Sequence, residues 1–411
     1  MAVREESLPR RRSAPVGRVR AAIEARTAGP WTTDAIVLTV LVAALTLIGL
    51  VMSFSASIVD AAVAGDAFGI FRRQLLWAAA GVPVFLLAAS VDHRVWRALS
   101  WVLVAGGLVG LALVLVPGFG VADGGSHRWL ALGPFVVQPS EITKLAAVLW
   151  LADVFQRKRE HGVDLYGDRK HLFVPALPFL TVVSVLLMAE PDLGTTLLHA
   201  MIVLLVLYAE LTPLRHLGGL LVVGATFGAA AAVAAPYRFA RLLGWWRPED
   251  DPLGNGYQLL QSLYALGDGG WFGLGLGSSR GKWNFVPNPE TDFIYAIIGE
   301  ELGLVGAVTV LLLFVGLLVV GLRVSRDAPD WFGRTVAFVV TAWLAAQALV
   351  NIGAVTGLLP ITGVTLPLVS VGGSSLLSTL LALGILVSIA RAAGERRSRR
   401  ARPAPAGRSL R

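Results

Sequence analysis

Long apolar segments alternate with short polar ones along most of the chain. Residues 36–52 and 305–320 contain no charged residue, and apolar runs of about this length can cross the hydrocarbon core of a bilayer as helices. Ten apolar segments can be drawn, at about 35–56, 74–90, 98–117, 140–155, 173–190, 195–211, 217–235, 292–320, 334–356 and 370–390. This pattern predicts an all-α polytopic membrane protein with about ten transmembrane helices.

The positive charges orient these helices. If both termini are cytoplasmic, 26 of the 35 Lys and Arg residues fall on the cytoplasmic side, as the positive-inside rule requires. Residues 1–34 and 391–411 are basic, and we interpret them as disordered cytoplasmic tails that flank a transmembrane domain at residues 35–390. Basic tails would also suit nucleic acid, but the membrane orientation explains their charge better, so we expect no nucleic-acid partner. Only 15% of the residues are charged, against about one quarter in soluble domains.

Three segments on the extracytoplasmic side carry unusual polar content, namely residues 117–140, 236–291 and 357–375. The second connects the seventh and eighth spans, and a loop of that length is usually functional or structured in its own right. Residues 256–267 within it have apolar positions at helical spacing, which predicts a short helix on the membrane interface.

Asp292 stands where this long loop meets the eighth apolar segment, in the stretch PNPETDFIYAIIGEELG. An aspartate at the start of a helix is commonly an N-cap, because its side chain accepts hydrogen bonds from free backbone N–H groups. A carboxylate can also act as a general base. The local stretch favours the cap, whereas the orientation places Asp292 beside other outward polar residues and makes the base an equal alternative.

Other charges are predicted at or near membrane depth, where each needs a partner or a function. Glu141 and Lys144 in QPSEITK lie three residues apart on one helix face, so they form either an internal ion pair or part of the wall of an outward-facing cavity. We expect Asp192 in EPDLGTT to cap the helix that follows it.

Glu300 and Glu301 follow Asp292 about two turns further along the same span. We expect one of them to point inward to a polar partner such as Asn351 or Gln347. Such a role is more often structural than catalytic.

Arg238, Arg241, Arg280 and Lys282 belong to the long outer loop. Any one of them could meet lipid head groups, but as a set they could bind a diphosphate, because Arg and Lys neutralise phosphate oxygens. The run GLGLGSS at 273–279 offers backbone N–H groups for the same purpose, although it lacks the strand–turn–helix context of a nucleotide fingerprint. The chain has no cysteine, and its six histidines form no spaced cluster, so the sequence predicts no metal site.

These residues suit an enzyme that acts on a membrane-anchored, phosphorylated substrate, and they also suit a transporter of such a lipid. Six motifs occur in order: RRQLLW (72–77), HRWLALGPFVVQPSEITKLA (127–146), EPDLGTT (190–196), YQLLQSLYALGDGGWFGLGLG (257–277), TDFIYAIIGEELGLVG (291–306) and NIGAVTGLLPITGVTLPLVSVGGSS (351–375). Together they resemble the SEDS family (shape, elongation, division and sporulation), the bacterial cell-wall glycan polymerases, over about residues 35–390. GLGLGSSRGKW and AIIGEELG are more similar to the division branch, FtsW, than to the elongation branch, RodA.

The resemblance implies a peptidoglycan glycosyltransferase that polymerises lipid II into β-1,4-linked glycan strands during septal synthesis and releases undecaprenyl diphosphate. It places the family's essential aspartate on Asp292, as the general base, and the membrane Glu–Lys pair on Glu141 and Lys144. Together with that pair, the predicted substrate-binding residues are Arg128, Arg238, Arg241, Lys282 and Ser374.

The resemblance also implies a class B penicillin-binding transpeptidase as a partner, other divisome proteins, and a place in the bacterial plasma membrane at the septum. A divalent cation could assist, although no dedicated ligand set is visible. Glu290 stands where the family commonly has His, and Val371 where it commonly has Tyr. Glu290 adds a negative charge that could raise the pKa of Asp292 or relay a proton. A lipid II flippase and a RodA-type elongation polymerase are the alternatives.

Overall fold

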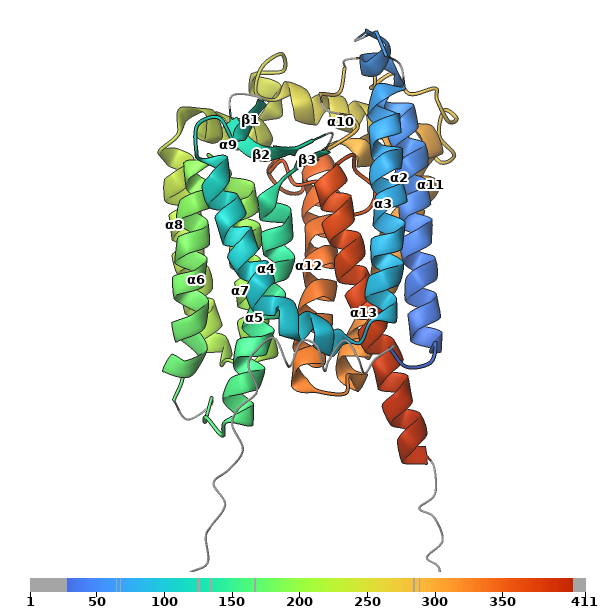
Figure 1. The fold of residues 1–411 in the computed structure, drawn as a ribbon. Helices are drawn as coiled ribbons and strands as arrows, with labels where there is room; N and C mark the ends of the chain where they lie inside the picture. Colours follow the sequence, from blue (N-terminus) through green and yellow to red (C-terminus); the bar gives the residue numbers. More distant parts are fainter. Residues whose placement is uncertain are drawn as a thin grey trace, which may run out of the picture.

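The computed structural model describes residues 28–63, 65–66, 68–123, 126–133, 135–165, 168–283, 285–287 and 289–401. Ten helices form an elongated bundle (Figure 1). They are α2 (Thr33–Val63), α3 (Gly69–Ser90), α4 (His93–Val114), α5 (Pro139–Glu160), α6 (Lys170–Ala189), α7 (Leu193–Ala209), α8 (Leu214–Val233), α11 (Ile294–Asp327), α12 (Trp331–Val355) and α13 (Gly373–Ala401). Each corresponds to one predicted apolar segment, which confirms the all-α membrane class.

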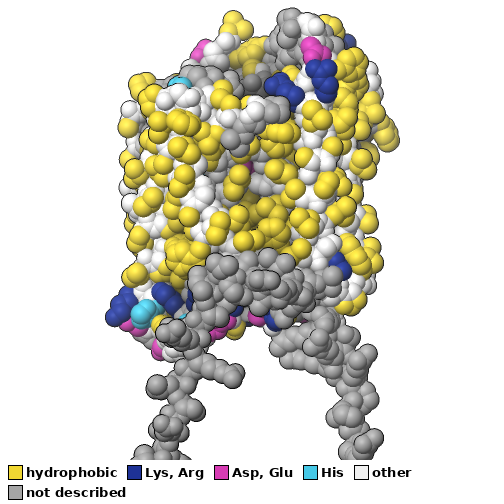
Figure 2. Space-filling view, in the orientation of Figure 1, with side chains coloured by type: hydrophobic (Ala, Val, Ile, Leu, Met, Phe, Trp, Pro, Cys, Tyr) yellow, Lys and Arg dark blue, Asp and Glu magenta, His cyan; other side chains and the backbone are white. Residues whose placement is uncertain are grey.

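Eight of these helices are long and apolar enough to cross a membrane. The other two are α7, which is apolar but has only 17 residues, and α5, which carries charges at both ends. Figure 2 shows hydrophobic side chains over the flank of the bundle and charged side chains gathered mostly near its two ends. That distribution is the one expected of a bundle whose flank contacts lipid.

The outer polar segments are more structured than the sequence indicated. Residues 117–140 contain a small antiparallel sheet of β1 (Gly120–Asp123), β2 (Ser126–Leu132) and β3 (Phe135–Val137), in that order. The long loop contains α9 (Pro236–Trp246), η1 (Pro248–Asp250) and α10 (Tyr257–Asp268). The sheet, α9 and α10 lie at the same end of the bundle (Figure 1). The sheet was not predicted, whereas α10 confirms the helix expected at 256–267.

The predicted tails differ from the structure at the C-terminal end. Helix α13 continues to Ala401, so the segment expected to be disordered from residue 391 begins as helix. Residues 1–27 and 402–411 lie outside the described residues.

We call the end that carries the sheet the outer end and the opposite end the inner end, after the orientation predicted from the charges. Buried charges at the inner end are paired. Asp153 on α5 accepts hydrogen bonds from Arg97 (2.8 Å) and Arg157 (2.8 Å) and from Ser100 (3.1 Å). Glu210, which follows α7, pairs with Arg159. These pairs satisfy carboxylates that would otherwise be costly to bury.

Candidate active site

Asp292 occupies the turn that leads into α11, and its side chain does not cap that helix. The N-cap position is Phe293, which makes no side-chain capping hydrogen bond. The cap interpretation of Asp292 is therefore wrong, because the helix begins two residues after it. The carboxyl group of Asp292 is left for another role.

The backbone around Asp292 is fixed by side chains from elsewhere in the chain. Asn351, near the end of α12, donates through Nδ2 to the carbonyl oxygens of Asp292 and Val364, at 2.8 Å each. The Ser370 hydroxyl donates to the Thr291 carbonyl oxygen at 2.6 Å. The proline- and glycine-containing segment before α13 thus holds Asp292 in place. Sequence reasoning missed both Asn351 and Ser370 in this role.

The surroundings of Asp292 raise its pKa. The side chain is half-buried, and burial raises its pKa to about 6. Arg241 on α9 lowers the pKa by its positive charge, and Asp192 raises it by its negative charge. The carboxylate that raises the pKa is thus Asp192, whereas the sequence suggested Glu290. A carboxyl group with a pKa near 6 can exchange a proton close to neutral pH.

Asp192 caps α7, as predicted. Its carboxylate accepts from the Thr195 backbone N–H (3.0 Å) and hydroxyl (2.8 Å). The first turn of α7 lies close to the segment before α13, because a Cβ built on Gly194 would come within 2.7 Å of the Thr362 carbonyl oxygen. A Cβ on the next residue of that segment, Gly363, would lie 3.6 Å from Oδ2 of Asp292. Residues 362–363 therefore bring Asp192 and Asp292 to the same site.

Arg128 reaches this site from β2. It donates to the Glu190 carbonyl oxygen (3.2 Å) and the Pro191 carbonyl oxygen (3.0 Å), and its Nη1 lies 3.7 Å from Oδ2 of Asp192. The small sheet thus positions the Arg128 guanidinium group at the outer end of α6 and α7. Arg241, on α9, is exposed.

Glu190 is a buried acid that sequence reasoning missed. Only 1% of its surface is exposed, and neither carboxyl oxygen has a hydrogen-bond partner in the described part of the chain. Burial raises its pKa to about 8, and the charge of Asp192 adds to that effect while Arg128 opposes it. The sequence signal that could have identified Glu190 is the motif EPDLGTT, in which one proline separates two acidic residues.

Glu141 and Lys144 form a buried ion pair inside the bundle. Lys144 Nζ lies 2.9 Å from Glu141 Oε1 and 5.1 Å from the centre of the Trp343 ring. Ser378 on α13 donates to the other Glu141 oxygen at 3.5 Å. The ion pair is therefore observed, and it joins α5 to α12 and α13.

Lys282 is engaged elsewhere. Its side chain is 4% exposed and its ammonium group lies 3.4 Å from Glu301 Oε1. Glu301 also accepts from the Ser55 hydroxyl at 2.7 Å, and Glu300 accepts from the Ser279 hydroxyl at 2.6 Å. The expectation that Glu300 or Glu301 binds Asn351 or Gln347 is wrong. Both glutamates hold the loop that precedes Lys282, which gives this lysine a structural partner.

The two other predicted substrate-binding residues also have protein contacts. Arg238 is half-buried, and its guanidinium donates to the Ala231 carbonyl oxygen at 3.2 Å. The Ser374 hydroxyl accepts from the Gln138 backbone N–H at 3.3 Å and links the start of α13 to the start of α5. The two departures from the family pattern also meet, because the Val371 N–H donates to the Glu290 carbonyl oxygen at 2.9 Å.

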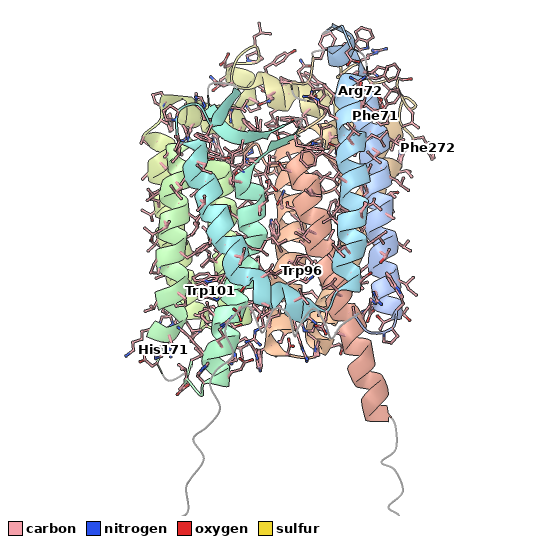
Figure 3. The ribbon with its side chains drawn as sticks, in the orientation of Figure 1. Phe71, Arg72, Trp96, Trp101, His171 and Phe272 are labelled. Carbon is pink, nitrogen blue, oxygen red and sulfur yellow. The ribbon has the colours of Figure 1, made fainter. Side chains whose placement is uncertain are left out.

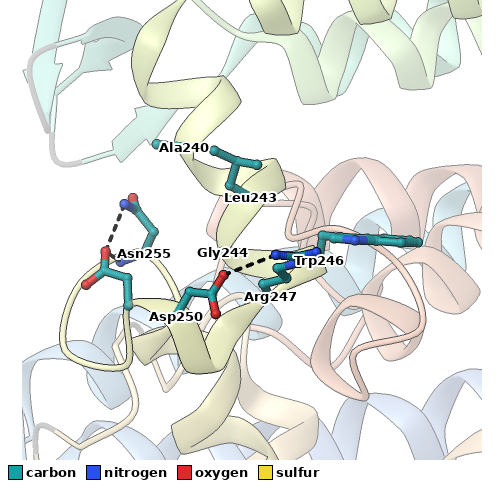
Figure 4. Close-up of a pocket in the computed structure, with 8 residues that line it drawn as sticks. Ala240, Leu243, Gly244, Trp246, Arg247, Asp250 and Asn255 are labelled. Carbon is teal, nitrogen blue, oxygen red and sulfur yellow. Dashed lines mark hydrogen bonds and ion pairs between the residues drawn. The ribbon is translucent and has the colours of Figure 1, made fainter.

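A cleft of about 450 Å³ opens on the outer surface beside α9 (Figure 4). Its lining includes Arg247 and Asp250, which lie 3.9 Å apart, together with Trp246 and Asn255. Asp292 is not among the lining residues. In the described part of the chain, no group of three or more His, Asp or Glu side chains is placed to hold a metal ion.

Comparisons with known proteins identify the family and the fold. The family model of the FtsW, RodA and SpoVE cell cycle proteins matches residues 35–395. Stage V sporulation protein E of Bacillus subtilis is 40% identical over 361 residues, which cover 88% of this chain and 98% of that protein. The probable peptidoglycan glycosyltransferase FtsW of Geobacter metallireducens is 38% identical over 355 residues, covering 86% and 94%. A chain in a solved peptidoglycan synthase complex has a TM-score of 0.70 at 31% identity, covering 87% and 97%.

Proposed function

The chain belongs to the FtsW, RodA and SpoVE family of cell cycle proteins, and we propose that it is a peptidoglycan glycosyltransferase that polymerises lipid II. The observation that carries this proposal is Asp292. Its carboxyl group does not cap α11, is half-buried at the outer end of the bundle, and has a pKa of about 6. The positive charge of Arg241 acts on it. Such a group is suited to accept a proton from a sugar hydroxyl.

In the proposed reaction, Asp292 removes the proton from the 4-hydroxyl of the acceptor sugar. The oxygen attacks the anomeric carbon of the growing strand's lipid-linked muramyl sugar. The bond between that carbon and the diphosphate oxygen breaks, and undecaprenyl diphosphate leaves with the electron pair. Inversion of the α-linked donor gives a β-1,4 bond. Holding two lipid-anchored sugars in line supplies much of the rate enhancement.

Arg241 and Arg128 are the cations best placed to stabilise the departing diphosphate. Arg241 is exposed and acts electrostatically on Asp292, and Arg128 reaches Asp192 from the sheet. Arginine binds phosphate oxygens through several donors at once. Lys282 contributes less in this scheme, because its ammonium group faces Glu301.

We further propose a role in division rather than elongation, with a penicillin-binding transpeptidase as partner and a place at the septum. Support for the division role comes from the relatives named FtsW. Support for the partner comes from the similarity to a chain of a complex in which polymerisation and crosslinking are coordinated.

The decisive experiment measures lipid II polymerisation by the purified protein in lipid, with and without its cognate transpeptidase. We expect Asp292→Asn to lower the rate by about 10²- to 10⁴-fold, the usual contribution of a general base. Asp268→Asn is the matched control, because Asp268 is an exposed aspartate at the end of α10. A folded Asp292→Asn protein that polymerises at the wild-type rate contradicts the proposal. Lipid scrambling without polymerisation would instead support a flippase.

A further inference from the structure

Helix α11 is broken at Gly303, and the outer loop fills the break. Gly303 has φ 68° and ψ −167°, which are not helical values. The carbonyl groups of Glu300 and Glu301 accept hydrogen bonds from the N–H groups of Leu274 (2.9 Å) and Gly275 (3.0 Å). In return, the N–H groups on the far side of the break donate to the loop, to the carbonyl oxygens of Gly270 and Trp271. Residues 270–275 are therefore hydrogen-bonded to residues 300–305 of α11.

The charges on α11 fix the level of this contact in the membrane. The charge-free part of α11 comprises residues 302–322, between Glu301 and Arg323. These residues would span about 32 Å as a helix, which matches the roughly 30 Å of a hydrocarbon core. The loop is bonded to the outer end of that stretch. Residues 270–276 are thus level with the outer end of the charge-free stretch.

The loop presents apolar side chains outward at this level. Trp271, Phe272 and Leu276 are 70%, 83% and 59% exposed. Figure 3 shows Phe272 pointing away from the bundle. Exposed Leu304 and Val305 continue this surface onto α11. The loop surface is thus continuous with the flank of the bundle that faces lipid.

Irregular backbone can lie at membrane depth where its polar groups bond within the protein, and several backbone N–H groups of residues 273–281 do so. The Ser279 N–H donates to Glu301 Oε1 (3.2 Å), the Arg280 N–H donates to Glu300 Oε1 (2.6 Å), and the Gly281 N–H lies 3.3 Å from Glu300 Oε2. Glu300 and Glu301 thereby accept hydrogen bonds from the backbone N–H groups of residues 279–281, which would otherwise need water as an acceptor.

We propose that residues 270–276 are inserted into the boundary between hydrocarbon and head groups of the outer leaflet, with Trp271 and Phe272 as its anchors. The occupant of this surface is the lipid itself. Aromatic side chains favour that boundary. The insertion would hold the loop, and the start of α11 that follows Asp292, at a constant level relative to the membrane. Under the proposed function, this is the membrane in which the lipid-linked substrate is anchored.

The test uses the fact that the chain contains no cysteine. Single cysteines at Phe272 and Leu276 receive a nitroxide label in the full chain reconstituted in lipid nanodiscs. Collision with oxygen, which partitions into lipid, is compared with collision with a water-soluble nickel chelate. Leu312, exposed in the middle of α11, is the lipid control, and Glu249, exposed in η1, is the water control.

We expect the ratio of oxygen to nickel collisions at Phe272 and Leu276 to exceed that at Glu249 several-fold and to stay below that at Leu312, which lies in the middle of the charge-free stretch. A ratio like that at Glu249 would place the loop in water and overturn the proposal. Protection from both reagents would mean that protein, such as a second copy, covers the surface, and would also overturn it. The two labelled positions are read separately, so one poorly folded variant leaves the test intact.

Discussion

At the scale of single residues, the ionisation of Asp292 depends on three nearby influences. Burial raises its pKa, the negative charge of Asp192 raises it further, and the positive charge of Arg241 lowers it. The outcome, a pKa of about 6, is well above the ordinary value of 3.8. A base in this range is ionised at neutral pH and is still strong enough to accept a proton.

The pH dependence of polymerisation follows from this balance. Only ionised Asp292 can accept a proton, so kcat/KM should rise with pH through a midpoint near 6. Asp192→Asn removes a negative neighbour and should move the midpoint to lower pH, while asparagine still caps α7. Arg241→Gln removes a positive neighbour and should move it to higher pH. The measurement is the initial rate of lipid II polymerisation between pH 4.5 and 8. Asp268→Asn is the control, and its midpoint should stay unchanged. Unchanged midpoints in both Asp192→Asn and Arg241→Gln would contradict this account.

The sequence located residues whose role depends on nearby neighbours more reliably than residues whose partners are distant. Asp192 was predicted as a cap because its partner, Thr195, is three residues away. The contact of Asn351 with Asp292 spans 59 residues, and that of Ser370 with Thr291 spans 79. Nothing in local spacing identifies such pairs. The same limit explains why Lys282 was assigned to substrate although it faces Glu301.

At the scale of elements, apolar length predicted the helices well, because burial in hydrocarbon requires about 20 apolar residues in a row. The predicted segment 173–190 became α6 (Lys170–Ala189), and 334–356 became α12 (Trp331–Val355). The break in α11 could not be predicted, since GEELGLVG also suits an unbroken apolar helix. The outer sheet was missed because its strands are only three to seven residues long.

The break in α11 should depend on Gly303. A Cβ at this position would lie 2.5 Å from the carbonyl carbon and oxygen of Trp271, and the positive φ disfavours any L side chain. We expect Gly303→Ala to lower the free energy of unfolding by about 1–3 kcal/mol. Gly316→Ala is the matched control on the same helix, because its Cβ would meet only the flexible Leu41 side chain at 3.4 Å.

The measurement for this pair is the apparent thermal unfolding midpoint of the detergent-solubilised protein. A lower midpoint for Gly303→Ala with an unchanged or higher midpoint for Gly316→Ala supports the role of the break. Equal midpoints for the two variants would mean that the loop contact at 270–275 contributes little to stability.

At the scale of the whole molecule, the two ends of the bundle carry different chemistry. The outer end collects Asp292, Asp192 and Glu190 with Arg128 and Arg241, and the pKa values of Asp292 and Glu190 are raised there. The inner end holds carboxylates that are already bound to arginine, as at Asp153. A reaction on a lipid-linked sugar therefore belongs to the outer end, provided that this end faces away from the cytoplasm.

The orientation itself was predicted from the distribution of Lys and Arg, and it can be tested directly because the chain has no cysteine. Glu249→Cys places a thiol in η1 at the outer end, and His161→Cys places one after α5 at the inner end, both at exposed positions. In intact cells, a membrane-impermeant maleimide should label Glu249→Cys and leave His161→Cys unlabelled. After the membrane is permeabilised, both should react, which controls for thiol accessibility. Labelling of His161→Cys in intact cells would show that the bundle has the opposite orientation. Asp292 would then lie on the wrong side of the membrane for polymerising an exported lipid-linked sugar.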